Sequence, residues 1–254
     1  MPRLPADFLR APLAHRALHD LSDGRPENSR AAISAAIAAG YGIEIDVQCS
    51  LDQRAMVFHD DDLARLADAS GPISAVDAAT LGQTALRGGR EGIPTLTEVL
   101  ELVAGRVPLL IEIKDQDGAM GPDVGPLERD VATALRGYQG PVALMSFNPH
   151  AVREVARLAP DIPRGLVTCD YSTEESHLPA VTRAHLQQIP DYDNLGCSFI
   201  SHDWHDLSRP RVAALKKQGA DILCWTVKSL AEEAQARKIA DNITFERYLA
   251  PFPA

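Results

Sequence analysis

The sequence predicts an α/β protein whose strands close into a (β/α)8 barrel, with a small insertion between the second barrel strand and the second barrel helix. Short apolar runs alternate with amphipathic segments along nearly the whole chain, which is typical of βα units and a parallel sheet. Eight such runs can be counted, and the chain has 254 residues. A TIM barrel has typically about 250 residues. Residues 1–254 are therefore expected to form a single domain.

The predicted strands are short and rich in aliphatic residues. The continuous apolar run Pro141–Met145 is typical of a strand that is buried on both faces of a sheet. The eight predicted strands cover residues 11–15, 42–47, 108–113, 142–146, 163–168, 197–201, 221–227 and 242–245.

Amphipathic segments between these strands predict the outer helices. Asn28 is a candidate cap for the first helix and Gly40 for its end, while Thr95 or Thr97 could cap the second helix. The predicted helices cover residues 28–39, 95–104, 124–137, 149–158, 173–187, 207–218 and 229–240.

One connection is longer than a crossover between neighbouring strands requires. Residues 48–94 separate the second strand from the second barrel helix. Within them, Ala55–His59 predicts an extra strand, Ser74–Thr80 a short helix and Gly88–Gly92 a flexible exit. We expect this segment to form a small insertion over the mouth of the barrel.

The charge balance limits the class of partner. The chain has 25 Lys and Arg against 35 Asp and Glu, a formal net charge of −10. A nucleic-acid-binding protein would show a basic patch or stripe, so this composition argues against nucleic acid. An anionic substrate remains compatible with it, because a bound cation can invert the local field.

Cysteine spacing and hydropathy bear on the compartment. The four cysteines lie far apart and form no C-x-x-C pair, which fits a reducing compartment better than a disulfide framework. The N-terminus has no apolar signal segment, and no stretch approaches the roughly 18 apolar residues of a membrane span. These observations predict a cytoplasmic protein without a membrane span, and they leave its oligomeric state undetermined.

Two of the predicted strands carry charged side chains at alternate positions near their ends. Glu44 and Asp46 lie two residues apart, and Glu112 and Lys114 have the same spacing. Such pairs share a face of a strand, and the carboxyl ends of barrel strands face the active site. Three converging carboxylates predict a site for a hard cation. The alternatives are a solvated strand edge and, for Glu112, an ion pair with Lys114 alone.

Two histidines fall at similar places. His15 closes the first strand, and His59 ends the extra strand of the insertion. An imidazole can accept or donate a proton near neutral pH, which makes both side chains candidates for acid and base beside the carboxylates. The alternative for each is a structural histidine with satisfied hydrogen bonds.

In this order and spacing, the residues resemble the glycerophosphodiester phosphodiesterase family. The resemblance extends from about residue 11 to about residue 249. Each motif alone is weak, but together they are a strong signal. The matching segments are Ala14–Arg16, Pro26–Ser29, Glu44–Val47, Val57–Asp60, Pro94–Leu100, Ile111–Lys114 and Trp225–Val227.

The resemblance implies a TIM barrel with a role for each of the matching residues. It implies one divalent metal ion, Mg²⁺ or Ca²⁺, and general acid–base catalysis by a pair of histidines. The implied metal ligands are Glu44, Asp46 and Glu112, the implied catalytic residues are His15 and His59, and the implied substrate-binding residues are Arg16, Lys114 and Trp225.

Neighbouring residues leave some of these roles open. Glu27 is a candidate for orienting Arg16 or His15. Arg16 could instead form only a structural salt bridge with Glu27 or Asp46, and Trp225 could belong to the barrel core rather than to the wall of a pocket.

The predicted function is therefore a metal-dependent hydrolase of lipid metabolism that cleaves small glycerophosphodiesters to glycerol 3-phosphate and an alcohol. Phosphodiester cleavage needs stabilisation of charge on the phosphate, a base for the attacking hydroxyl and an acid for the leaving oxygen. The attacker could be the 2-hydroxyl of the glycerol, through a cyclic phosphate, or a water molecule. The alternatives are phospholipase D-type activity on lysophospholipids and a non-catalytic barrel that binds phosphorylated ligands.

Three departures from the family pattern concern the fit of the alcohol portion. His-Arg-Gly of the family reads His15-Arg16-Ala17, Trp-Thr-Val-Asn ends in Lys228, and Thr-Asp-x-Pro reads Thr244–Arg247. If the position of Ala17 requires a positive φ, alanine there costs on the order of 1 kcal/mol relative to glycine. None of the three removes a candidate ligand or histidine.

Overall fold

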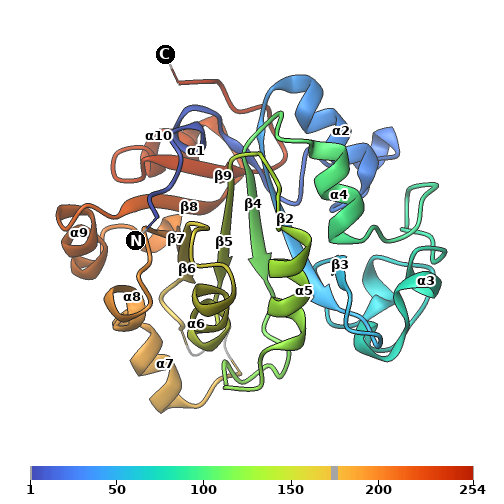
Figure 1. Cartoon of the computed structure of the whole chain (residues 1–254). Helices are drawn as coiled ribbons and strands as arrows, with labels where there is room; N and C mark the ends of the chain where they lie inside the picture. Colours follow the sequence, from blue (N-terminus) through green and yellow to red (C-terminus); the bar gives the residue numbers. More distant parts are fainter. Residues whose placement is uncertain (1, 173–176, 254) are drawn as a thin grey trace.

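The computed structural model describes residues 2–172 and 177–253 and shows a closed barrel of parallel strands inside a ring of helices (Figure 1). β1 pairs in parallel with both β2 and β9, which closes the barrel, and this confirms the predicted fold class. The barrel strands are β1 (Leu13–Ala14), β2 (Gly42–Cys49), β4 (Leu109–Ile113), β5 (Val142–Ser146), β6 (Arg164–Thr168), β7 (Phe199–Asp203), β8 (Asp221–Val227) and β9 (Asn242–Phe245).

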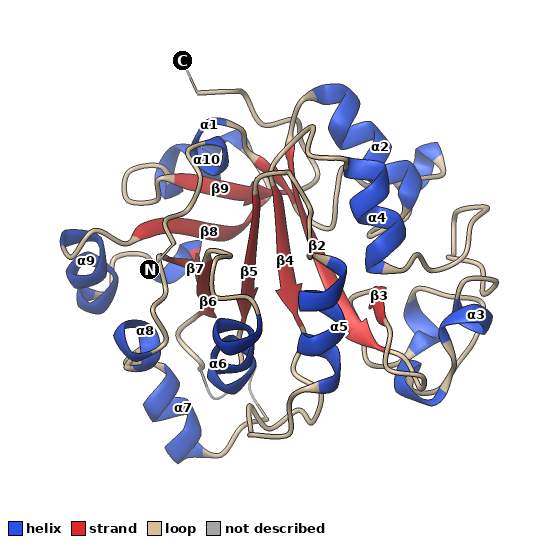
Figure 2. Ribbon diagram, viewed as in Figure 1, coloured by secondary structure: helices blue, strands red, loops and turns tan. Residues whose placement is uncertain are grey.

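Helices follow the strands on the outside of the barrel, as Figure 2 shows. No helix among the described residues is long and apolar enough to cross a membrane. The α-helices are α1 (Asp7–Arg10), α2 (Arg30–Ala39), α3 (Ala78–Leu81), α4 (Leu96–Val103), α5 (Pro126–Ala134), α6 (Pro149–Leu158), α7 (Ala180–Leu186), α8 (Asp191–Asn194), α9 (Pro210–Lys217) and α10 (Leu230–Ala236). The 3₁₀ helices are η1 (Leu21–Asp23), η2 (Leu63–Arg65), η3 (Ile73–Ala75) and η4 (Trp204–Asp206).

Helix boundaries differ from the predictions at several places. The cap of α2 is Ser29, whose side chain accepts a hydrogen bond from the backbone N–H of Ala32, and not Asn28 as predicted. For α4, Thr95 is the cap, within a complete capping box. The helix predicted over 173–187 begins at Ala180 after Pro179, and residues 173–176 lie outside the described part of the chain.

Two layers of apolar side chains flank the strands, and together they orient the polar side chains of β2. Ile43, Ile45 and Val47 face outward into the layer between the barrel and its helices. The alternate residues of the strand must then face the barrel interior. There, an inner cluster that includes Leu110 and Phe8 of α1 fills the barrel toward the amino ends of the strands. The charged residues lie toward the carboxyl ends of the strands.

The predicted insertion is present after β2. Its strand β3 (Ala55–Val57) pairs antiparallel with β2, with Val57 opposite Val47. The insertion lies beside the barrel, to the right in Figure 1, where β3 and α3 are labelled. It has its own buried cluster, to which Met56, Phe58 and Ile73 belong. This packing fixes the strand that delivers His59 to the barrel.

Replacement of Gly165 by alanine is expected to destabilise the fold by about 1–3 kcal/mol through overpacking. A Cβ atom at this position of β6 would lie 2.5 Å from Cε2 and 2.6 Å from the backbone oxygen of Phe199. Urea unfolding of the variant measures the loss. The control is Gly82→Ala, because a Cβ there makes only an ordinary 3.4 Å contact. Equal stability of the two variants would contradict the expectation.

Candidate active site

The three predicted carboxylates lie together inside the barrel, near the carboxyl ends of the strands. The register of β2 and β4 places Asp46 directly beside Glu112. Glu44 lies two residues before Asp46 and on the same face of β2. One oxygen atom from each of the three carboxylates lies within 4.8 Å of the others. All three residues are buried, with exposed fractions of 2%, 1% and 7% for Glu44, Asp46 and Glu112.

Burial and mutual repulsion give this cluster an uneven charge distribution. Burial, followed by the charges of Asp46 and Glu112, raises the pKa of Glu44 well above its usual range. Burial acts in the same direction on Asp46, but the nearby positive groups, Lys114 first, lower the pKa of Asp46 to about 2. The protein surroundings therefore favour the charged form of Asp46 and disfavour that of Glu44.

Two cationic side chains border the carboxylates. Nζ of Lys114 donates a hydrogen bond to Oε1 of Glu112 at 2.8 Å and lies 3.5 Å from Oδ1 of Asp46. The guanidinium of Arg16 donates to Glu27 at 2.7 Å, and its Nε lies 3.6 Å from Oδ2 of Asp46. Although burial opposes the charged form of both, the neighbouring carboxylates raise the pKa of Lys114 and of Arg16. The ammonium group of Lys114 and the guanidinium group of Arg16 therefore stay positively charged, and both face the same cavity.

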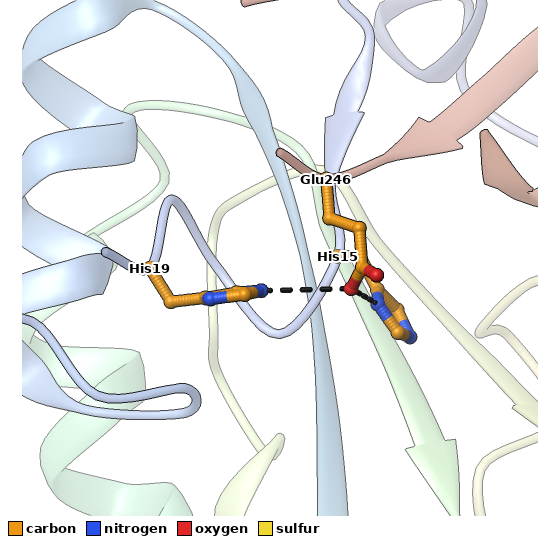
Figure 3. A group of neighbouring side chains, drawn as sticks. All are labelled: His15, His19 and Glu246. Carbon is orange, nitrogen blue, oxygen red and sulfur yellow. Dashed lines mark hydrogen bonds and ion pairs between the residues drawn. The ribbon is translucent and has the colours of Figure 1, made fainter. Parts of the chain in front are cut away.

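His15 contacts a carboxylate that was not among the predicted site residues. Its Nδ1 lies 2.8 Å from Oε2 of Glu246, which follows β9, and His19 lies on the other side of the same oxygen at 3.6 Å (Figure 3). With a proton on Nδ1, His15 donates to Glu246 and its Nε2 carries the free electron pair. Burial lowers the pKa of His15 below its usual value, although Glu246 opposes this effect. The hydrogen bond from His15, followed by the nearby ring of His19, lowers the pKa of Glu246.

His59 enters the site from the insertion. Its Nδ1 lies 2.6 Å from Oδ1 of Asp60, and its Nε2 lies 3.3 Å from Nζ of Lys114. Arg65 donates two hydrogen bonds of 2.6 Å to the carboxylate of Asp60 and also contacts Glu27. Asp60 therefore holds the ring of His59, as Glu246 holds that of His15, and leaves Nε2 on the side of the carboxylates.

These side chains border one small cavity of about 100 Å³ at the carboxyl ends of the strands. Trp225 is half-buried in its wall, where its ring meets Phe147 edge to face at 5.5 Å and its Nε1 donates to the backbone oxygen of Ser201. Every predicted catalytic, metal and substrate-binding residue lines this cavity, and Glu27 contacts it through Arg16.

The donor set fits a hard divalent cation. Mg²⁺ and Ca²⁺ prefer oxygen ligands, and carboxylates are the usual protein source. The three oxygen atoms of Glu44, Asp46 and Glu112 converge, and burial together with repulsion from Asp46 and Glu112 raises the pKa of Glu44, an effect that a bound cation would oppose. When bound, such an ion supplies positive charge for the oxygens of a phosphate.

The sequence reasoning missed three residues that hold the site together. Glu246 and Asp60 each bind a histidine ring, as described above. Asn28, predicted as a helix cap, instead donates from Nδ2 to Asp46 at 3.0 Å and has a positive φ of 59°. Two local signals were available: Glu246 directly follows the last barrel strand, and Ser29, beside Asn28, is itself a good cap.

Comparison with known proteins identifies the family to which the chain is similar. A model of the glycerophosphoryl diester phosphodiesterase family matches residues 15–241. A protein of Caldanaerobacter subterraneus named glycerophosphodiester phosphodiesterase is 29% identical over 227 residues, which cover 85% of this chain and 84% of that protein.

Solved structures share the fold. The structure of an Oleispira antarctica phosphodiesterase in complex with its product sn-glycerol-3-phosphate has a TM-score of 0.76 and 25% identity, and covers 94% of this chain and 93% of that one. A glycerophosphodiester phosphodiesterase from Parabacteroides distasonis has a TM-score of 0.71 and 24% identity, covering 92% and 91%.

Proposed function

Because the chain belongs to the glycerophosphoryl diester phosphodiesterase family and is an enzyme of that class, we propose that it uses one divalent cation to cleave small glycerophosphodiesters. The products are glycerol 3-phosphate and an alcohol. The proposed ligands of the cation, Mg²⁺ or Ca²⁺, are Glu44, Asp46 and Glu112. The substrates that fit this chemistry are deacylated phospholipid head groups, which places the reaction in lipid metabolism.

One observation carries the proposal. Three buried carboxylates lie in the same 100 Å³ cavity as two histidines whose outer ring nitrogens are each fixed by a carboxylate. A non-catalytic phosphate-binding barrel has no need of a pair of oriented imidazoles. An acid, a base and a cation site in one cavity are what cleavage of a phosphodiester requires.

The proposed division of roles follows from charge and position. Arg16 and Lys114 bind the phosphate oxygens, and Trp225 lines the site for the rest of the substrate. His15 and His59 transfer the protons to and from the attacking and leaving oxygens through their Nε2 atoms. The same groups serve attack by the glycerol 2-hydroxyl and attack by water, so the route is a matter for product analysis.

The cavity is too small to enclose an acyl chain. Pockets that enclose drug-sized ligands are roughly 300–1,000 Å³, whereas this cavity has about 100 Å³. An acyl chain would have to lie outside it. We therefore place phospholipase D-type activity second.

A turnover assay tests the proposal. With Mg²⁺ or Ca²⁺ present, the enzyme is expected to release glycerol 3-phosphate from glycerophosphocholine and related diesters. Detection of a cyclic glycerophosphate intermediate distinguishes the two routes. Faster turnover of lysophospholipid vesicles would reverse the ranking of substrates, and binding of diesters without hydrolysis under either metal would refute the hydrolase proposal.

A further inference from the structure

A second group of metal-binding side chains lies beside the carboxylate cluster and has a different chemistry. It consists of His15, His19 and Glu246 (Figure 3). We propose that these three side chains bind Zn²⁺, and that zinc bound there inhibits the enzyme. The inhibition rests on the function proposed above, because it acts through His15, whereas the binding does not.

The distances match those of a tetrahedral site. One Glu246 oxygen, Oε2, lies 2.8 Å from Nδ1 of His15 and 3.6 Å from Nε2 of His19, and the three ligand atoms all lie within 4.8 Å of one another. Zinc binds nitrogen and carboxylate oxygen at about 2.0–2.2 Å, so two ligand atoms of a tetrahedron lie about 3.3–3.6 Å apart. Small rotations of the side chains are therefore sufficient to surround the ion.

His19 has a ring nitrogen that protein contacts leave unused. Its Nε2 is buried and makes no hydrogen bond among the described residues, and its contact with Glu246 at 3.6 Å is longer than a hydrogen bond. A buried polar nitrogen without a hydrogen bond is costly, and a metal ion would satisfy it. This nitrogen is directed at the same carboxylate oxygen as the ring of His15, as Figure 3 shows.

The cluster is accessible from a cavity other than the catalytic one. His19 and Glu246 line a cavity of about 590 Å³ between the loop after β1 and the segment after β9, whereas His15 lines the catalytic cavity. The three side chains thus stand between the two cavities. The larger one offers an entry path and room for a water molecule or an external ligand at a fourth position.

The positive groups near Glu246 contact the carboxylate oxygen that is not the proposed zinc ligand. Nζ of Lys228 and Nε of Arg247 both contact the other oxygen of Glu246, Oε1, at 3.3 and 3.4 Å. The ligand set also separates this site from the first, because imidazole suits zinc while Mg²⁺ and Ca²⁺ prefer oxygen ligands. Excess Mg²⁺ should therefore occupy the carboxylates and leave this cluster to zinc.

Zinc at this position would change the state of His15. Zinc would bind the electron pair of Nδ1, and the single proton of the neutral ring would move through solvent from Nδ1 to Nε2. That nitrogen faces the catalytic cavity and no longer has a free electron pair to accept a proton. A ring held in this tautomer cannot act as a general base.

The experiment measures zinc binding and activity on separate samples of the Mg²⁺-saturated enzyme. Equilibrium dialysis with ZnCl₂ is expected to give one Zn²⁺ per chain beyond the Mg²⁺ site, and CoCl₂ should give the visible absorption of tetrahedral Co²⁺. Loss of one ligand in His19→Ala should weaken zinc binding at least about tenfold. The matched control is His205→Ala, which removes an exposed histidine that contacts Asp203 and Trp204 and lines neither cavity.

The outcomes distinguish the proposals. If His19→Ala and wild type bind zinc with equal affinity, the proposed site is wrong. It is also wrong if Mg²⁺ displaces the bound zinc and Glu112→Gln abolishes zinc binding. Zinc binding that depends on His19 without loss of turnover overturns the inhibition. If zinc binding depends on His19 but no diester is hydrolysed, the site stands and the proposed function fails. Thermal unfolding of both variants ensures that a lost site is not a lost fold.

Discussion

Replacement of His15 or His59 by alanine is expected to lower kcat/KM for glycerophosphocholine by about 10²-fold or more, which is the usual contribution of a positioned acid or base. Each ring has one nitrogen held by a carboxylate, Glu246 or Asp60, and the other on the side of the carboxylate cluster. Loss of either ring therefore removes a proton-transfer group and leaves the carboxylates in place.

The burial of His15 leads to a further prediction, about the pH dependence of activity. Because its pKa is lowered below the usual value of 6.5, this ring is neutral at pH 7 and suited to the role of base. The acid limb of the kcat/KM profile should then have its midpoint below pH 6.5. Glu246→Gln removes a charge that raises the pKa of His15, so this variant should move the limb to still lower pH and reduce kcat more than it changes KM.

The control is His150→Ala on α6, since His150 contacts Arg153 and not the site. Added imidazole should restore part of the activity of the His15 and His59 variants, which a purely structural role would not allow. A loss smaller than about threefold in both variants would discredit the assignment, because general acid–base catalysis contributes at least about 10²-fold.

The sequence was sufficient for the parts of the site that depend on strand periodicity. The i, i+2 spacing of Glu44 and Asp46 determines that they share a face, and the apolar residues between them determine that this face is the barrel interior. Glu112 follows from the same rule on the neighbouring strand. Their convergence required only that β2 and β4 be adjacent, which the barrel prediction already contained.

Contacts that depend on closure of the barrel or on loop geometry were not predictable in this way. Glu246 contacts His15 across 231 residues, only because β9 pairs with β1. Asn28 contacts Asp46 because a positive φ turns its side chain away from the helix that it was expected to cap. Ala17 adopts a φ of 66°, the conformation for which the family's glycine is suited.

Removal of divalent cations by a chelator is expected to lower activity by at least about 10³-fold, equivalent to several kcal/mol of charge stabilisation. Addition of Mg²⁺ or Ca²⁺ should restore it. Without a cation, the buried acidic cluster repels the negatively charged phosphodiester. Arg16 and Lys114 each also donate a hydrogen bond to a carboxylate, Glu27 and Glu112, so their charges offset only part of what the ion would supply.

Glu44→Gln tests the ligand set against a closely matched control. Glu44 and Glu128 are both buried glutamates whose pKa values burial raises, and each accepts a backbone hydrogen bond, from Arg16 at 2.8 Å and from Gly125 at 2.6 Å. A glutamine can accept the same hydrogen bond at either position. Glu128 caps α5 outside the site, so Glu128→Gln should keep its activity and its response to metal.

Thermal unfolding with and without Mg²⁺ separates a ligand from a merely buried acid. A cation at 100 times its Kd stabilises the folded state by about 2.7 kcal/mol. Wild type and Glu128→Gln should show this metal-dependent rise in Tm, whereas Glu44→Gln should not. The metal-free Glu44→Gln protein should be at least as stable as wild type, because the substitution removes a carboxyl group whose charged form is disfavoured by burial and by the neighbouring carboxylates. An undiminished metal response in Glu44→Gln, with activity retained, would exclude Glu44 as a ligand.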